Sequence, residues 1–198
     1  MIDIIHARRV FDAYLDQFDR TDEKIRLKII HTDGVVCYMT EICRRMGMPE
    51  EERRLAELIA LLHDIGRFEQ LKRYDSFERD TMDHAAYGVR LLFGEQQMIR
   101  RFVMEDTWDD IIREAIARHS DFSGYDPALT RRQLLHVQLI RDADKLDNCR
   151  VKLEEPIEVL LGCTAEEVGQ QDISPEVWKE CQARTSVHLE KRKTKMDY

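Results

Sequence analysis

Turn-forming residues are scarce in this sequence, with 8 glycines and 4 prolines among 198 residues. An all-β fold needs many tight turns and is therefore disfavoured. Paired cysteines are missing as well, because the five cysteines are an odd number and none of them forms a CxxC pair. This pattern disfavours a disulfide framework and a cysteine zinc site, and it is typical of thiols in a reducing cytoplasm.

Long apolar segments and an excess of basic residues are also lacking. No apolar run approaches the roughly 20 residues that span a bilayer, and the first residues carry charges where a signal peptide would be apolar. Lys and Arg total 31 against 39 Asp and Glu, for a net charge of -8. Duplex-DNA binding usually requires a basic surface. We therefore expect a cytoplasmic protein that binds neither membranes nor duplex DNA.

What the sequence does contain is a helical periodicity along most of its length. Val10, Tyr14 and Phe18 lie four residues apart, which gives a helix one apolar face. Similar patterns predict helices over 6–19, 23–46, 50–66, 81–93, 95–104, 107–120, 131–150 and from Pro175 onward. Residues 67–80 are interpreted as a loop or a short helix, and the basic end of the chain from Lys191 is expected to fray. The fold class expected is an all-α, single-domain bundle of about seven to nine helices.

Chemistry is indicated first by an adjacent His63-Asp64 pair at the end of the most apolar of these helices, in the segment LLHDIGRFEQ. A carboxylate buried there without a partner would be costly, and a metal ion is a partner that removes this cost. Nitrogen and carboxylate ligands from several helices commonly build a metal site in a bundle. Four further candidates lie on other predicted helices: His31, His84, His119 and Asp144. Taken alone, a histidine on an apolar face is more often a core residue, so the prediction depends on the ordered set.

The order of His31, the His63-Asp64 pair and Asp144 resembles that of the HD-domain superfamily of metal-dependent phosphohydrolases. The surrounding segments are similar too. LIALLHDIGRFEQ resembles the family's apolar helix with its His-Asp-x-Gly turn, and RDADKLDN resembles its closing Ala-Asp-x-Leu helix. The resemblance implies an all-helical, metal-binding phosphohydrolase core. The domain organisation expected is an N-terminal helix packed on the core over 1–23, the core over 24–150 and a C-terminal helical extension over 151–198.

The last ligand of the set needs a choice between neighbouring carboxylates. Asp142 and Asp144 are about 200° apart around a helix, so both cannot face one ion. The resemblance favours Asp144, because it follows an alanine and precedes a basic residue and a leucine. Asp147 is about 60° away from Asp144 and is expected near the rim of the same pocket. Asp142 is interpreted as a structural or supporting group.

Two further histidines raise the question of a second ion. His84 and His119 resemble the additional ligands of HD proteins that hold two ions, with Asp64 as the bridge between them. The other three ligands would then bind the first ion. The alternative is that both histidines bind the substrate phosphate, as in relatives with one ion. The resemblance implies one or two divalent ions, for which Mn, Mg, Co, Fe and Ni are candidates, and two such ions can activate a shared water and neutralise a phosphate.

Basic residues beside the ligands are candidate phosphate contacts. Arginine suits phosphate geometry, although each of these side chains is alternatively a solvated charge in a chain with 35% charged residues. Asp83 precedes His84 and is interpreted either as an acid or base or as a helix cap. The catalytic residues expected are Asp64, Arg67, Asp83 and Lys145, and the substrate-binding residues expected are Arg67, Arg118 and Lys145.

The function expected is metal-dependent hydrolysis of a phosphate ester or a nucleotide. Two alternatives stay open. One is a di-iron HD-fold oxygenase, which the same six ligands would serve, and the other is a non-catalytic module that senses a nucleotide. The expected partner is a small phosphorylated substrate, with a nucleotide favoured, and a homodimer is left open.

Overall fold

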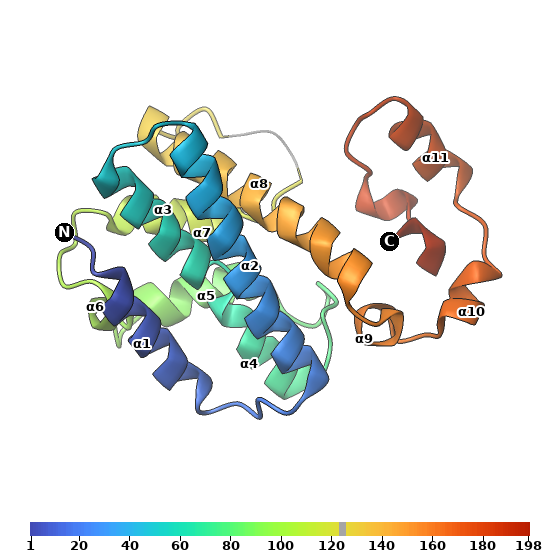
Figure 1. Ribbon diagram of the computed structural model, residues 1–198, viewed down its shortest axis with the longest axis horizontal. Coiled ribbons are helices and arrows are strands. Elements are labelled where there is room, and N and C mark those ends of the chain that lie inside the picture. The colour runs from blue at the N-terminus through green and yellow to red at the C-terminus, as the bar shows by residue number, and fades with distance from the viewer. Residues whose placement is uncertain (123–125) are drawn as a thin grey trace. The chain divides into compact units, whose positions relative to one another are not determined.

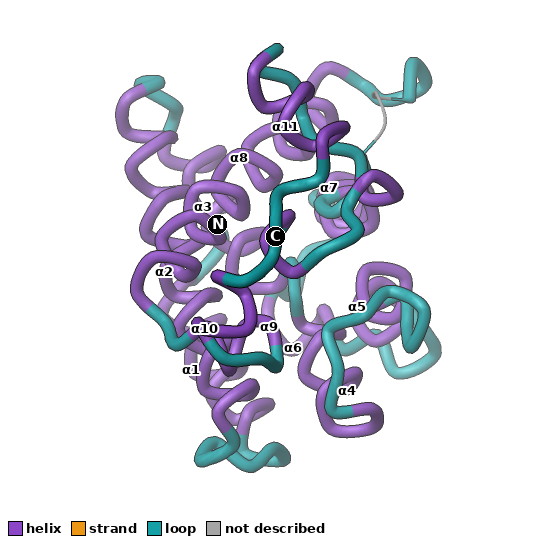
Figure 2. The backbone as a smooth tube through the Cα atoms, turned by 90° about the vertical axis from the view of Figure 1, so that its right-hand side faces the viewer, coloured by secondary structure: helices purple, strands orange, loops and turns teal. Residues whose placement is uncertain are grey.

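The computed structural model describes residues 1–122 and 126–198, and in these residues every regular element is a helix (Figure 2). The predicted all-α fold is confirmed. The α-helices are α1 (Ile4–Leu15), α2 (Glu23–Arg45), α3 (Glu50–Leu62), α4 (Ile65–Tyr74), α5 (His84–Phe93), α6 (Ile99–Phe102), α7 (Asp109–Arg118), α8 (Arg131–Glu154), α9 (Ile157–Leu161), α10 (Ala165–Gly169) and α11 (Pro175–Gln182). Two 3₁₀ helices follow, η1 (Leu189–Lys191) and η2 (Lys195–Asp197). None of the helices in the described ranges combines the length and apolar character that crossing a bilayer demands.

The chain forms two compact units, Met1–Val151 and Lys152–Tyr198. In the first unit α2 packs against α3 and α4, α4 packs against α5, and α7 packs against both α3 and α5 (Figure 1). Helix α3 is buried on most sides because Leu58, Ile59 and Leu62 are all fully inaccessible to solvent. The C-terminal end of α3 therefore lies in the middle of the first unit.

The N-terminal helix α1 is joined to this centre by one buried tyrosine. The Tyr14 hydroxyl donates a hydrogen bond of 3.0 Å to the backbone carbonyl of Ile65, at the start of α4. Its ring also makes an edge contact with Phe68. Because burial removes the hydroxyl from water, the pKa of Tyr14 is raised above its usual value and the side chain stays a neutral donor. Helix α1 thus supports the turn that carries His63 and Asp64.

The break between α3 and α4 is sharper than the periodicity predicted. The sequence indicated one helix to about Gly66, whereas α3 ends at Leu62 and a new helix begins at Ile65. Ile65, Phe68 and Leu71 are buried at a helical spacing, but the charged residues between them mask this pattern. The sequence predicted part of residues 65–74 as a loop or short helix, but these residues form the regular helix α4. The turn at His63 and Asp64 sets the direction of this helix.

The end of the second unit is ordered, and the expectation that it frays is wrong. The Asp197 carboxylate accepts hydrogen bonds from the Ser174 amide at 2.8 Å and from the Ser174 hydroxyl at 2.6 Å. It also accepts from the amides of Lys193 and Thr194. Burial alone would raise the pKa of Asp197, but these hydrogen bonds lower it. One buried carboxylate therefore holds the last turn of the chain, a role that the basic composition of this segment did not indicate.

We expect the fold of the second unit to weaken in acid. Hydrogen bonds from Lys191 and from the His188 amide lower the pKa of Glu180 from 4.5 to about 2. A carboxyl group whose pKa is depressed by folding stabilises the folded state fully above its unfolded pKa, and this stability is lost as the pH falls through the folded pKa. The loss should therefore run from about pH 4.5 to about pH 2. Hydrogen exchange on the full chain, corrected for intrinsic rates and read on peptides from 172–198, measures it.

The matched variants for this prediction are Glu180→Gln and Glu190→Gln. The first should lose protection at neutral pH and show a flatter acid profile, because the amide carries no charge to titrate. The second removes an exposed carboxyl group and should behave as the wild type. Protection of these peptides that stays constant between about pH 5 and pH 2.5 would show that Glu180 does not hold this unit.

Candidate metal centre

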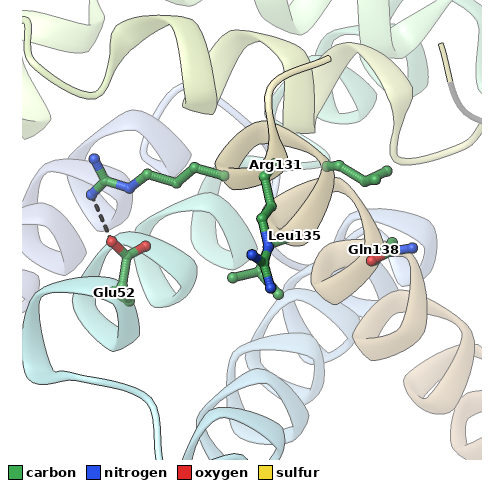
Figure 3. Close-up of a pocket in the computed structure, with 6 residues that line it drawn as sticks. Glu52, Arg131, Leu135 and Gln138 are labelled. Carbon is green, nitrogen blue, oxygen red and sulfur yellow. Dashed lines mark ion pairs between the residues drawn. The ribbon is translucent and has the colours of Figure 1, made fainter. Parts of the chain in front are cut away.

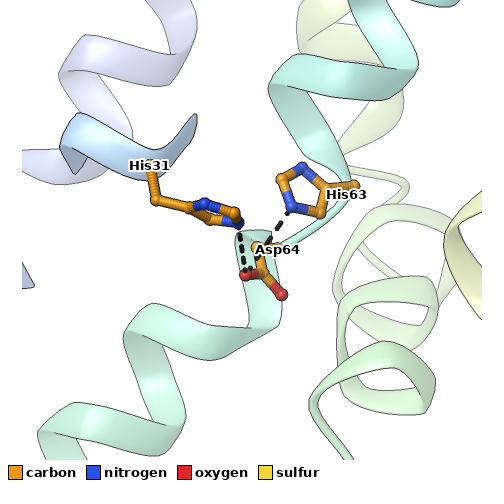
Figure 4. A group of neighbouring side chains, drawn as sticks. All are labelled: His31, His63 and Asp64. Atoms are coloured by element: carbon orange, nitrogen blue, oxygen red, sulfur yellow. Dashed lines mark ion pairs between the residues drawn. The ribbon is translucent and has the colours of Figure 1, made fainter. Parts of the chain in front are cut away.

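Three of the predicted ligands meet where α2 crosses the turn between α3 and α4. His31 comes from the middle of α2, His63 directly follows α3, and Asp64 directly precedes α4 (Figure 4). One ligand atom of each lies within 4.8 Å of the others, and all three side chains are buried. The turn between the two helices presents the consecutive side chains of His63 and Asp64 to the same place.

Asp144 reaches the same place from α8. Its Oδ1 lies 3.1 Å from Nε2 of His31 and 3.7 Å from Nε2 of His63. Asp142, by contrast, is exposed on the same helix, as the angle of about 200° between the two residues predicts. The structure therefore brings together His31, His63, Asp64 and Asp144, in the order that the sequence indicated.

A second group of ligands shares Asp64. His84 is the first residue of α5 and His119 directly follows α7. Their Nε2 atoms are 3.1 Å apart, and they lie 3.2 Å and 3.5 Å from Oδ1 of Asp64. Both histidines are 3% exposed. Oδ1 of Asp64 thus faces this pair, whereas its Oδ2 faces His31 and His63 at 3.9 Å and 3.6 Å.

The hydrogen bonds on the far side of each ring fix which nitrogen carries the proton. Nδ1 of His63 donates to the Ala60 carbonyl and Nδ1 of His119 donates to the Ile116 carbonyl, both at 2.7 Å. A carbonyl oxygen can only accept, so in the neutral rings both Nε2 atoms are left as acceptors. The Arg67 guanidinium donates to Nε2 of His84 at 2.9 Å, which makes that nitrogen an acceptor as well.

In this centre, hydrogen-bond acceptors therefore face one another without a donor between them. Nε2 of His63 and Oδ1 of Asp64 are buried without a hydrogen-bond partner in the described residues. An orphaned buried acceptor carries a desolvation cost of about 1–3 kcal/mol. A cation placed among these lone pairs would remove that cost, and imidazole nitrogens with carboxylate oxygens are ligands that suit Mn, Fe, Co, Ni and Zn ions. The donor set fits a divalent metal ion.

The charges of the centre support the ionised carboxylates that a metal requires. Burial alone would raise the pKa of Asp64, but the charge of Lys28 holds the pKa well below its usual value. The imidazole rings of His31 and His63 beside Asp144 lower the pKa of this carboxyl group as well. Burial lowers the pKa of His84 to about 4. At neutral pH the carboxylates are therefore anionic and the His84 ring is neutral, which are the ligand forms of both groups.

Asp147 has a larger role than the rim position predicted from its spacing. Its side chain is fully buried, and its Oδ2 accepts a hydrogen bond of 2.7 Å from Nδ1 of His31. Arg150 donates to its other oxygen, also at 2.7 Å. A carboxylate behind a histidine fixes the ring and raises its basicity as a ligand. Gly34 makes room for this pair, because a Cβ at that position would lie 1.8 Å from Oδ1 of Asp147.

Gly34→Ala is expected to weaken metal binding without removing any ligand. The added methyl group displaces the Asp147 carboxylate, and with it the hydrogen bond that orients His31. Loss of such a supporting contact typically costs about 10–100-fold in metal affinity. Equilibrium dialysis against Mn²⁺ followed by metal analysis measures the change. Gly169→Ala is the control, since no atom lies within 4 Å of its Cβ. Equal affinity of Gly34→Ala and wild type would show that Asp147 does not orient His31.

Among the predicted phosphate contacts, Arg67 lies in the centre. Its side chain is 12% exposed, and its Nε is 3.8 Å from Oδ1 of Asp64. A second cation there was missed from the sequence: Nζ of Lys28 lies 2.6 Å from Oδ2 of Asp64. Lys28 precedes His31 by three residues, a spacing that places both side chains on one face of α2. That spacing was the available signal, but the sequence offers many charged residues at such distances from a histidine.

The other three predicted residues lie away from the acceptor cluster or are otherwise engaged. The Arg118 guanidinium binds Glu114 at 2.7 Å and Asp126 at 3.1 Å. The Asp83 side chain caps α5 by accepting a hydrogen bond from the Ala86 amide, which is the capping alternative named above. Lys145 is exposed on α8 beside Asp144. Their catalytic and substrate-binding roles stay predictions.

A separate pocket of about 530 Å³ lies at the start of α3 and α8 (Figure 3). Arg132 crosses it to form an ion pair with Glu52 at 2.8 Å. None of the six candidate metal ligands lines this pocket. The side chains that line it are Glu52, Arg131, Arg132, Leu134, Leu135 and Gln138.

Comparison with known proteins agrees with this geometry. The family model described as HD domain matches residues 29–149, which is more than half of the chain and contains all six candidate ligands. No curated protein and no solved structure matches the chain. The chain belongs to the HD domain family.

Proposed function

We propose that this protein is a metal-dependent phosphohydrolase that cleaves a phosphate ester or a nucleotide. The observation that carries the proposal is the pair of ligand groups that share Asp64, each with its acceptors turned inward. Membership of the HD domain family supports it, since the resemblance noted above is to metal-dependent phosphohydrolases. Two divalent ions bridged by one carboxylate can lower the pKa of a water and neutralise the charge of a phosphate.

The candidate ligands would have distinct roles in this function. His31, His63 and Asp144 would hold one ion, His84 and His119 would hold the other, and Asp64 would bridge them. Asp147 keeps the His31 ring in place by its hydrogen bond of 2.7 Å. Such fixed ligands place the reacting groups before reaction, which reduces the entropy cost of bringing them together.

Arg67 is the residue that would act on the substrate. Its guanidinium is mostly buried and adjoins both Asp64 and His84. An arginine in this position would bind the phosphate oxygens and stabilise the charge that grows on them in the transition state. Arg67 also contacts the lone pair of His84 that a second ion would use, so we propose that it turns to the phosphate when that ion is bound.

The test combines metal analysis with a substrate panel. The purified full chain is first analysed for bound metals, then incubated with nucleotides and phosphate esters after addition of Mn²⁺, Mg²⁺ or Co²⁺. Phosphate release that requires metal supports the proposal. A metal-loaded sample that releases phosphate from no compound in the panel would contradict it. Bound iron together with oxygen-dependent turnover would favour the di-iron alternative.

A further inference from the structure

Lys28 is a mostly buried cation that the proposed ligand set does not use. It projects from α2, its side chain is 13% exposed, and its Nζ lies 2.6 Å from Oδ2 of Asp64. Burying an ammonium group is costly unless it is paired. Asp64 provides that pairing, but the same oxygen faces His31 and His63 and belongs to the first ligand group. When a metal ion binds Asp64, Lys28 shares the charge of this carboxylate with the ion and therefore needs a second negative partner.

Arg67 stands on the other side of the same carboxylate. Its Nε is 3.8 Å from Oδ1 of Asp64, and this Nε is buried with no hydrogen-bond partner in the described residues. Phe77 connects the two cations, because its carbonyl accepts from Arg67 at 3.1 Å and its ring centre lies 5.9 Å from Nζ of Lys28. Two cations from α2 and α4 thus flank Asp64, and Phe77 contacts both of them.

The charges of these groups indicate the anion that would fit. Asp64 and Asp144 carry two negative charges, which Lys28 and Arg67 balance. Each divalent ion that binds adds two positive charges to this balanced set. A phosphate monoester carries close to two negative charges at neutral pH, whereas a diester carries only one, so the monoester compensates the excess better.

We propose, on the basis of the proposed function, that Lys28 and Arg67 together bind the phosphate of a phosphate monoester and select monoesters over diesters. Arg67 offers its unpartnered Nε, because its Nη1 donates to Gln70 and to the Phe77 carbonyl and its Nη2 donates to His84. Lys28 offers a point charge that can follow the phosphate oxygens. A diester shares one negative charge over two non-bridging oxygens, whereas a monoester offers three such oxygens and close to two charges to the cations and the ions. The substrate class is therefore a small molecule that ends in a phosphate monoester.

The test uses binding, which does not depend on turnover. The full chain is loaded with Mn²⁺ and titrated calorimetrically with inorganic phosphate, methyl phosphate and dimethyl phosphate. Wild type should bind the first two more tightly than the diester. Lys28→Met and Lys28→Gln should each weaken phosphate and methyl phosphate by about tenfold or more, because a charge-assisted contact is lost. Lys28→Arg should keep most of the affinity, and Arg26→Met, which removes an exposed charge from the same helix, should keep all of it.

The Mn²⁺ content and Mn²⁺ affinity of each variant give an independent reading. A lysine that only neutralises Asp64 would, when replaced, change Mn²⁺ affinity and leave phosphate binding to the loaded protein unchanged. That result overturns the inference, and so does equal binding of methyl and dimethyl phosphate by wild type. If Lys28→Met does not fold, Lys28→Gln provides the same test. Monoester-selective binding without turnover of any ester would support the inference while refuting the proposed function.

Discussion

Asp64→Asn is expected to abolish binding of both proposed ions and to lower the proposed metal-dependent phosphate release by about 10³-fold or more, because the lost carboxylate serves both ligand groups. The substitution keeps the size of the side chain and removes only its charge. It also leaves the mostly buried Lys28 without its ion-pair partner, so a lower Tm is expected as well. Metal analysis of the dialysed protein, thermal unfolding and the phosphate-release assay measure the three effects.

Two other aspartates on α8 make this prediction specific. Asp144→Asn should lose one ion and keep the other, since Asp144 contacts His31 and His63 only on the first side of the centre. Asp142→Asn should behave as wild type, because Asp142 is exposed. If Asp64→Asn retained two ions per chain, Asp64 would not be the bridge and the two-ion arrangement would fail.

Gly66→Ala is expected to destabilise the first unit and to separate the two ligand groups. A Cβ on Gly66 would lie 2.2 Å from the carbonyl oxygen of His84 and 2.7 Å from the amide nitrogen of Gly88. Both are backbone atoms, so α4 and α5 must move apart to relieve the contact. Overpacking of this kind costs about 1–3 kcal/mol, occasionally more, and the movement carries His84 away from Asp64. Thermal unfolding and the number of bound Mn²⁺ ions per chain measure the two consequences.

Gly88→Ala is the matched control on the facing helix. The nearest atoms to its Cβ are at 3.4 Å, on Gly66 and Ile65, which is close to ordinary contact. Alanine is favoured over glycine inside a helix by about 1 kcal/mol, so this variant should be as stable as wild type or slightly more so. A Gly66→Ala protein with wild-type stability and two bound ions would show that the α4–α5 contact does not set the position of His84.

The sequence predicted most helices of the first unit and indicated the candidate ligands. Periodicity finds an amphipathic helix because a buried face repeats every 3.6 residues, and the helices that it predicts around His31 and Asp144 correspond to α2 and α8. The same periodicity missed the division of α3 from α4. The turn at His63 and Asp64 lacks a proline or a positive-φ glycine to mark it, and the apolar pattern continues through it.

The sequence also could not identify the partners of the ligands. Lys28 and Asp64 are 36 residues apart and Asp147 is 116 residues from His31, and no rule of local spacing joins such residues. Gly34 and Gly66 have no distinctive local conformation that would mark them. Their importance arises only because a carboxylate in one case, and a second helix backbone in the other, approaches too closely for a Cβ.

The amino-acid order by itself thus predicted an all-helical chain, because helix faces are local properties, and its resemblance to the HD-domain superfamily indicated six candidate metal ligands. The tertiary structure alone decided that Asp147 orients His31 and that Lys28 and Arg67 flank the carboxylate of Asp64. These are contacts between helices, and they depend on how the helices cross and how closely their backbones pack, which the pattern along one helix does not contain.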